Sequence, residues 1–140
     1  MSQKTYHHER LSPAHEALLS AVRPNMSVLD IGCATGVVAR ALKELGCRVT
    51  GVEVSDDMAR EAARHADEVV VGDISRAETR EKLAGPYDCI VFADVLEHLV
   101  DPWETLRWAR ELLADGGCVL ASIPNVAYYE VRFGLLAGRF

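Results

Sequence analysis

Residues 28–36, with the sequence VLDIGCATG, join a short apolar stretch to a turn bracketed by two glycines, and a helical pattern follows at once. The apolar positions of that pattern are Val37, Val38, Ala41, Leu42 and Leu45. Such a turn places backbone N–H groups and a helix N-terminus at the carboxyl end of a strand, where a small polar ligand can lie against the backbone. The segment therefore predicts a strand, a cofactor-binding turn and a helix.

The glycine spacing of this turn argues against two common nucleotide sites. A dinucleotide fingerprint, G-x-G-x-x-G, counted from Gly32 would need glycine at the positions of Ala34 and Val37. A phosphate-binding P-loop would need G-K-[ST] at its end, and no such triplet follows Gly36. A nicotinamide or nucleotide-sugar enzyme of the same architecture is therefore disfavoured.

Two acidic residues stand where the predicted strands meet this turn. Asp30 precedes the glycine turn directly, and an acid at the end of an apolar strand is a poor choice for a core position. Glu53 ends the next predicted strand, residues 48–53. A carboxylate there can accept hydrogen bonds from both hydroxyls of a ribose.

Strand and helix patterns alternate five times along the chain. The expected strands cover residues 28–31, 48–53, 69–71, 89–93 and 118–123. Five helices are expected. The first is capped by Ser12 before Pro13, the second follows the turn at Gly36, and the others begin at capping residues Ser55, Ser75 and Asp101. Right-handed crossovers then give an α/β fold with a doubly wound, mostly parallel sheet of strand order 3-2-1-4-5, and this order opens a crevice at the strands' carboxyl ends.

In this order of motifs the chain resembles the Rossmann-like (class I) S-adenosylmethionine-dependent methyltransferases. The first motif lies at residues 30–36, the ribose acid at Glu53, the adenine-edge acid within residues 72–74 and the strand-four motif at residues 92–99. The closing residues 123–140 resemble a small bacterial subgroup of methyltransferase domains, and more distantly the methionine-biosynthesis W proteins. The resemblance covers the chain from about Asp30 to its end.

The resemblance implies binding of S-adenosylmethionine, with S-adenosylhomocysteine as product. The implied cofactor residues are Asp30, Gly32, Cys33, Ala34, Gly36, Glu53, Val54, Met58, Asp73, Ile74, Ala93 and Asp94. Asp73 would hold the adenine edge and Asp94 the methionine ammonium, although each could instead serve as an ordinary turn or cap residue. Because relatives often carry glycine where this chain has Ala34, a left-handed backbone there would be strained.

The implied reaction is in-line transfer of the methyl group to an O, N or C nucleophile of a small-molecule acceptor. His98 is the candidate general base, and an ordinary packed or loop histidine is the competing interpretation. Tyr6, Tyr128 and Tyr129 either close over the ligand or pack in the core. A non-catalytic S-adenosylmethionine-binding module, or a subunit of a complex, is the alternative function.

Composition restricts the remaining possibilities. The chain has 140 residues, a formal net charge of −6 and no basic run, so a nucleic-acid backbone is not an expected partner. It has neither an apolar run of about 18 residues nor a secretion leader, which predicts a cytoplasmic protein without a membrane span. No C-x-x-C pair occurs, so reduced core cysteines are expected at Cys33, Cys47, Cys89 and Cys118. No metal site is expected, since the pair His7 and His8 lacks further ligands.

Residues 1–140 are expected to form a single domain that is incomplete at its C-terminus, because the family's sheet usually ends in two antiparallel strands that this chain lacks. The fifth strand would then leave an open edge. That edge could be covered by a second copy of the chain, by a partner, or by a last amphipathic helix with Val126, Tyr129, Phe133 and Leu136.

Overall fold

The computed structural model describes residues 10–125 and 128–138. Tyr6, the pair His7 and His8, and Val126 lie outside the described residues. The sheet has five strands, β1 (Ser27–Ile31), β2 (Arg48–Glu53), β3 (Glu68–Val71), β4 (Tyr87–Ala93) and β5 (Leu113–Ser122). Their order is β3-β2-β1-β4-β5 and every pairing is parallel. The predicted fold class and strand order are therefore confirmed.

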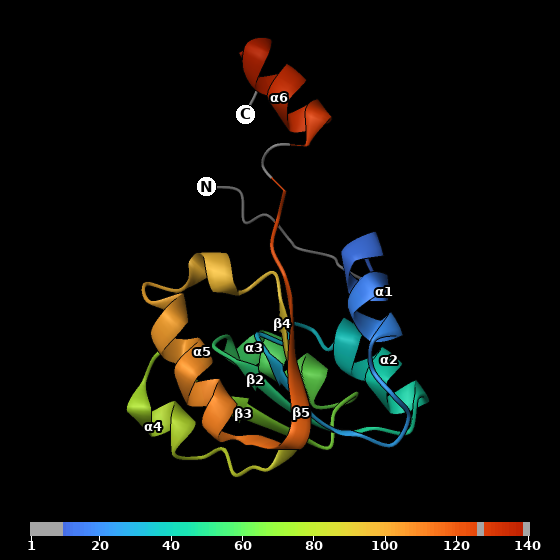
Figure 1. Ribbon diagram of the computed structural model, residues 1–140, viewed down its shortest axis with the longest axis vertical. Coiled ribbons are helices and arrows are strands. Elements are labelled where there is room, and N and C mark those ends of the chain that lie inside the picture. The colour runs from blue at the N-terminus through green and yellow to red at the C-terminus, as the bar shows by residue number, and fades with distance from the viewer. Residues whose placement is uncertain (1–9, 126–127, 139–140) are drawn as a thin grey trace.

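Helices cover both faces of this sheet, as a doubly wound fold requires. They are α1 (Pro13–Ser20), α2 (Val37–Glu44), α3 (Asp56–Ala62), α4 (Ala77–Arg80), the 3-10 turn η1 (Leu96–His98), α5 (Pro102–Glu111) and α6 (Tyr129–Leu136). Figure 1 shows α4 and α5 on one side of the sheet and α1 and α2 on the other. The segment after β5 leads to α6, which stands apart from the sheet.

Alternation along β1 divides the core into two layers. Leu29 and Ile31 point into a cluster shared with Ile90, Phe92 and residues of α5. Val28 points the other way, into a cluster that contains residues of α2 and α1. Asp30 shares the side of Val28 and is 1% exposed, so a carboxyl group lies inside an otherwise apolar layer.

None of the four cysteines forms a disulfide, and Cys47, Cys89 and Cys118 belong to the second of these layers. Cys33, Cys47 and Cys89 are buried, Cys118 is half-buried, and all four are free. This confirms the expectation of reduced core cysteines. Cys89 and Cys118 occupy paired positions on β4 and β5.

The first helix begins as predicted, and part of its expected apolar face is buried. Ser12 caps it, since its side-chain oxygen accepts a hydrogen bond of 3.2 Å from the backbone N–H of His15. The sequence pattern places five apolar residues on one face of this segment: Ala14, Ala17, Leu18, Ala21 and Val22. The three alanines are exposed, whereas Leu18 and Val22 pack in the core beside Leu11 and Leu19. The larger side chains are buried because they have more apolar surface to remove from water than the alanines.

The predicted capping box at Ser75 is wrong. Both the backbone N–H and the hydroxyl of Ser75 donate to Oδ1 of Asp73, at 2.9 and 2.6 Å. The short helix α4 therefore starts later, at Ala77, and its cap residue Arg76 makes no side-chain capping bond. Ser75 forms an Asx turn with Asp73 instead of a helix cap, because the carboxylate of Asp73 is an acceptor only two residues away.

Strand β5 is longer than predicted and begins at Leu113 instead of residue 118. Its register against β4 shifts between the pairs Tyr87–Leu113 and Cys89–Cys118, so the Gly116–Gly117 segment forms an irregularity inside the strand. Within residues 10–125 and 128–138, no strand pairs with the outer edge of β5. Of the alternatives for covering this edge, the last helix does not do so, because α6 extends away from the sheet and its Phe133 and Leu136 are exposed.

Candidate functional site

The turn after β1 folds back onto β2 at the carboxyl edge of the sheet. The backbone N–H groups of Gly32 and Cys33 both donate to the carbonyl oxygen of Val52, at 2.8 and 3.0 Å. The N–H of Gly36 donates to the carbonyl oxygen of Cys33 at 2.8 Å. The expectation that the turn offers free N–H groups is therefore wrong at these three positions. These N–H groups hold the shape of the turn, and Gly32 and Cys33 line the clefts beside it.

The two glycines of the turn serve different contacts. Gly32 has φ +72°, and a Cβ added there would lie 2.5 Å from Cγ2 of Val95. Gly36 has φ +85°, and a Cβ there would lie 2.9 Å from the backbone Cα of Ala62 in α3. Gly32 thus faces Val95, whereas Gly36 is required for the packing of α2 against α3.

Ala34 has φ +47°, the left-handed backbone that is strained for alanine. Its N–H donates to Oε2 of Glu53 across 3.0 Å. The other oxygen of Glu53, Oε1, accepts from the N–H of Ser55 at 2.9 Å. Each carboxylate oxygen keeps a second lone pair, so Glu53 can still accept hydrogen bonds from a ligand while it holds both loops.

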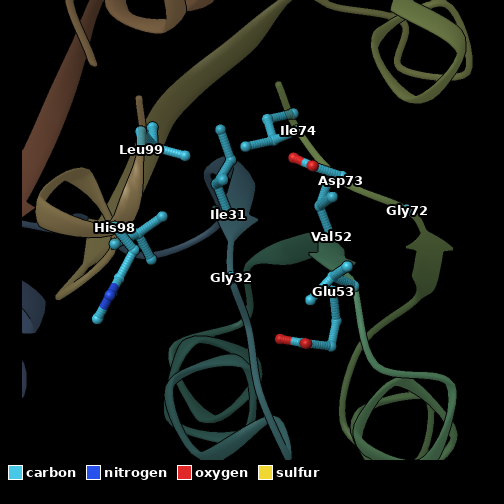
Figure 2. Close-up of a pocket in the computed structure, with 11 residues that line it drawn as sticks. Ile31, Gly32, Val52, Glu53, Gly72, Asp73, Ile74, His98 and Leu99 are labelled. Carbon is cyan, nitrogen blue, oxygen red and sulfur yellow. The ribbon is translucent and has the colours of Figure 1, made fainter. Parts of the chain in front are cut away.

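A cleft of about 250 Å³ opens beside this carboxylate and is called the Glu53 cleft here. Its lining residues are Ile31, Gly32, Val52, Glu53, Val54, Gly72, Asp73, Ile74, Val95, His98 and Leu99. Figure 2 shows the aliphatic side chains of Ile31, Ile74 and Leu99 gathered at one end and the carboxylate of Glu53 at the other. A ligand with an apolar ring and a polyhydroxylated part fits this division.

The outer wall of the Glu53 cleft is held in place by Arg80. Its Nε–H donates to the carbonyl oxygen of Ile74 at 2.7 Å, and its guanidinium pairs with the carboxylate of Glu104 in α5. It also lies over the ring of Trp108, 5.0 Å from the centroid. On the same loop, hydrogen bonds from the hydroxyl and N–H of Ser75 lower the pKa of Asp73.

A second cleft, of about 460 Å³, lies on the other side of Gly32 and is called the Asp94 cleft here. Its lining residues are Ser12, His15, Asp30, Gly32, Cys33, Ala34, Thr35, Val37, Val38, Ala93, Asp94, Val95 and His98. Gly32, Val95 and His98 line both clefts. The two clefts therefore adjoin, and one elongated ligand can occupy both.

Asp30 is the most unusual group of the Asp94 cleft. It is 1% exposed, and neither carboxyl oxygen has a hydrogen-bond partner among the residues that the structure describes. Burial, with a smaller contribution from the charge of Glu53, raises the pKa of Asp30 to about 7. A buried carboxylate without a donor is costly, so this position suits a ligand that brings a cationic N–H group.

Asp94 is fixed by the end of β5. It has φ +56°, a left-handed backbone that is uncommon for aspartate. The hydroxyl of Ser122 donates to its Oδ1 at 2.7 Å, and its own N–H donates to Ser122 Oγ at 3.0 Å. Its other oxygen, Oδ2, lies 3.7 Å from Nε2 of His15 on α1.

The structure brings together most of the predicted residues. Ten of the twelve predicted cofactor residues line one of the two clefts. The exceptions are Gly36, which faces α3, and Met58, which lines neither cleft. His98 lies at the junction of the clefts, but its side chain is 77% exposed and points outward, with Nε2 3.8 Å from Oε1 of Glu97.

The thiol of Cys33 takes no obvious part in binding. Burial first, then the charges of Asp30 and Glu53, raises its pKa far above the ordinary thiol value. Cys33 therefore stays protonated and acts as a small apolar wall.

Several lining residues were missed by sequence reasoning. Ser12 and His15 were read only as part of a helix start, although Ser12 was recognised as its cap. Val95 and Leu99 lie inside the strand-four motif and were not singled out. Only their position in sequence could have indicated them, since Val95 follows Asp94 and Leu99 follows His98, both predicted site residues.

The described residues contain no cluster of three or more metal-ligating side chains. Within that same part of the chain, no helix is long and apolar enough to cross a bilayer.

Comparison with known proteins identifies the class. A family model described as "Methyltransferase domain" matches residues 4–138. The ubiquinone biosynthesis O-methyltransferase of Caulobacter sp. (strain K31) is 38% identical over 104 residues, which cover 71% of this chain and 41% of that protein. The chain therefore belongs to this methyltransferase-domain family. It spans about half the length of the curated relatives it matches.

Two solved structures share the fold and a moderate sequence likeness. The CcbJ methyltransferase from Streptomyces caelestis gives a TM-score of 0.68 at 29% identity, over 81% of this chain and 50% of that one. Coclaurine N-methyltransferase, crystallised with N-methylheliamine and S-adenosylhomocysteine, gives 0.63 at 25% identity, over 86% of this chain and 38% of that one.

Proposed function

We propose that this chain is the cofactor-binding domain of an S-adenosylmethionine-dependent methyltransferase that modifies an oxygen atom of a small molecule. The observation that carries the proposal is the pair of adjoining clefts on either side of Gly32, each with its own carboxylate. One cleft presents Glu53 and the other the unpartnered Asp30. Their spacing along one crevice suits a ligand with hydroxyls at one end and an ammonium group at the other.

The Glu53 cleft would hold the adenosine. Glu53 accepts the ribose hydroxyls with the lone pairs that Ala34 and Ser55 leave free. The aliphatic end formed by Ile31, Ile74 and Leu99 would take the adenine ring, with Asp73 at its edge. Absence of a side chain at Gly32 lets the ligand pass from one cleft into the other.

The Asp94 cleft would hold the methionine end and the acceptor. The ammonium group of methionine is the donor that the buried carboxylate of Asp30 lacks. Asp94, the other acid of this cleft, was the residue that the sequence assigned to the ammonium. Its Oδ1 already accepts from Ser122, which favours Asp30 for that role.

When bound, S-adenosylmethionine supplies a methyl group on a positively charged sulfur. The chain's own contribution is orientation and removal of water, and proximity alone lowers such a barrier by about 7–11 kcal/mol. Relatives named as O-methyltransferases support a catalytic role over that of a non-catalytic binding module, and they support oxygen as the acceptor atom.

Isothermal titration of the full chain tests this function directly. We expect S-adenosylmethionine and S-adenosylhomocysteine to bind and NAD not to bind, since a pyrophosphate would meet side chains at Ala34 and Val37. Equal affinity for NAD, or no binding of S-adenosylhomocysteine, would contradict the proposal.

The partner expected from the open edge of β5 is a second copy of the chain. Unpaired N–H and C=O groups along such an edge promote pairing with another strand. Light scattering at several protein concentrations should show a mass that rises above that of the monomer. A constant monomer mass would contradict this expectation.

A further inference from the structure

His15 and Asp94 face each other across the Asp94 cleft, from two elements far apart in the sequence. Nε2 of His15 and Oδ2 of Asp94 are 3.7 Å apart, which is longer than a hydrogen bond. The His15 side chain is 15% exposed and the Asp94 side chain 39% exposed. The two atoms thus form an open pair at the wall of the cleft, and a third atom about 2.8 Å from each can fit between them.

The helix cap of α1 fixes which nitrogen of His15 carries the proton. The backbone N–H of Ser12 donates to Nδ1 of His15 at 3.4 Å, as part of the reciprocal capping box. Nδ1 must therefore be unprotonated, and the neutral imidazole carries its hydrogen on Nε2. The group that points at the cleft is a donor.

Asp94 presents the complementary group. Its Oδ1 accepts from the hydroxyl of Ser122, and its backbone is held by two hydrogen bonds from its N–H to the same residue. Oδ2 is consequently the oxygen turned toward His15. A donor on α1 and an acceptor after β4 thus flank one position in the cleft.

We propose that His15 Nε2–H and Asp94 Oδ2 together bind the hydroxyl group of the methyl acceptor, with Asp94 receiving its proton. This inference rests on the proposed function and names the two residues that select oxygen. The hydroxyl donates to Asp94 Oδ2 and accepts from His15 Nε2–H. Ser122 is a positioning residue, since it orients Asp94 without touching the acceptor.

The pair discriminates a hydroxyl from an amine because the two acceptor atoms carry different numbers of lone pairs. A hydroxyl oxygen has two, so one can accept from His15 while the other attacks the methyl carbon. A neutral amine has a single lone pair, and a hydrogen bond from His15 would occupy the electrons needed for attack. His15 therefore favours a hydroxyl acceptor over an amine.

The step is balanced without any further reactant. The acceptor oxygen forms a bond to the methyl carbon with its second lone pair. The bond from that carbon to sulfur breaks, and its electron pair stays on sulfur. The hydroxyl proton passes to Oδ2 of Asp94. The products are a methyl ether, a neutral thioether and a protonated Asp94.

The test uses a matched pair of small probes, catechol and benzene-1,2-diamine, which differ only in the acceptor atoms. Apolar walls at Val37, Val38 and Val95 suit an aromatic body. The full chain saturated with S-adenosylhomocysteine is titrated with each probe and followed by NMR, and methyl transfer from S-adenosylmethionine to each probe is measured in parallel. The variants are His15→Leu, His15→Gln and Asp94→Asn, with His65→Leu as the control outside both clefts.

We expect catechol to bind loaded wild-type protein at least tenfold more tightly than the diamine. His15→Leu and Asp94→Asn should each weaken catechol binding at least tenfold, the loss expected of a charge-assisted or buried hydrogen bond. His15→Gln keeps a donor at the end of the side chain and should recover part of that loss. Affinity for S-adenosylhomocysteine should change less than twofold in every variant, and His65→Leu should match wild type.

The outcomes separate this inference from the proposed function. Failure of wild-type protein to bind S-adenosylhomocysteine would contradict the proposed function itself. Normal binding of S-adenosylhomocysteine, combined with any of three results, would overturn the role of the pair alone. These results are no binding of catechol, equal binding of the diamine, and variants that bind catechol like wild type.

Discussion

The backbone N–H of Ala34 donates to Oε2 of Glu53 across 3.0 Å, which ties the turn after β1 to the residue that ends β2. One carboxylate therefore has two tasks. It holds the turn in shape through Ala34 and the next loop through Ser55, and its remaining lone pairs face the cleft. Loss of this side chain should affect a ligand both directly and through the two loops.

Glu53→Ala should weaken binding of S-adenosylhomocysteine by about 1.5–3 kcal/mol, the range for hydrogen bonds to a charged group. Isothermal titration measures the change. Glu68→Ala removes an exposed carboxylate from the start of β3 and is the matched control, for which we expect no change. Unaltered affinity in the Glu53 variant would show that the ribose lies elsewhere.

Asp30→Asn should make the ligand-free protein more stable at pH 8 and weaken its binding of S-adenosylmethionine. Burial raises the pKa of Asp30 to about 7, so between pH 4 and 7 the folded protein binds a proton that the unfolded chain has released. Its contribution to stability is hence most favourable at low pH and falls as the pH rises to about 7. The full loss is at most about 4 kcal/mol, at 1.36 kcal/mol for each pH unit.

Chemical unfolding of wild type and Asp30→Asn from pH 4 to pH 8 isolates this effect. The difference in unfolding free energy between the two proteins should shift in favour of the variant as the pH rises. Saturating S-adenosylmethionine should reduce the pH dependence of wild type, because a bound ammonium stabilises the ionised carboxylate. Two curves that stay parallel over this range would contradict the assignment.

Gly32→Ala should destabilise the protein and block passage between the clefts. A Cβ at this residue would lie 2.5 Å from Cγ2 of Val95 and would need φ +72°. The left-handed backbone costs alanine about 1–2 kcal/mol, and the overlap adds about 1–3 kcal/mol. In a Val95→Ala background only the backbone cost should remain, so a double-mutant cycle should give a coupling of about 1 kcal/mol or more.

Gly36→Ala is the contrasting variant. Its added Cβ would meet the backbone of Ala62, which cannot rotate away, so Val95→Ala should give no relief. Equal rescue of both glycine variants would show that Val95 is not the group that Gly32 accommodates.

Ala34→Gly should stabilise the protein. Ala34 has φ +47°, which glycine adopts without strain, whereas glycine adds about 0.4–1 kcal/mol of freedom to the unfolded chain. Removing the left-handed backbone strain of alanine should stabilise the folded protein by about 1–2 kcal/mol, which exceeds that cost. The expected net gain in stability is about 0.5–1 kcal/mol. Urea unfolding measures it, and a loss of stability would show that the alanine methyl group packs usefully in the Asp94 cleft.

Arg80→Lys should loosen the wall of the Glu53 cleft. Lysine cannot reproduce the planar contacts to Ile74 and Glu104, and about 1–2 kcal/mol of stability should be lost with them. Affinity for S-adenosylhomocysteine should fall severalfold because the carbonyl that fixes Ile74 loses its donor. Arg110→Lys, on the exposed side of α5, should change neither quantity.

Local sequence signals predicted the strands, the glycine turn and the order of the sheet, because each depends on the spacing of residues close along the chain. The same signals predicted the acids Asp30 and Glu53, since polar residues that end apolar strands stand out. Where two local signals competed the outcome was not predictable. Ser75 could cap a helix or join a turn with Asp73, and the turn prevailed.

Contacts between distant segments were beyond such reasoning. His15 lies opposite Asp94 only because α1 packs against the end of the sheet. No sequence pattern within either segment indicates this packing. The irregular start of β5 likewise depends on its pairing with β4. The expected apolar face of the first helix was right only in part for a related reason, because the surface that the helix meets decides which of its apolar residues are buried.

Because His15 lies on α1, the residues proposed to bind the acceptor and those proposed to bind the methyl donor come from different segments of the chain. Glu53, Asp30 and Gly32 belong to the sheet and its turns, whereas His15 reaches the crevice from a short helix that precedes the first strand. On the proposed roles, an exchange of residues 10–22 between relatives should change the part of the acceptor preference that His15 supplies, while Glu53 and Asp30 keep the site for the methyl donor. Asp94 lies outside that helix, so the proposed preference for a hydroxyl depends on both segments.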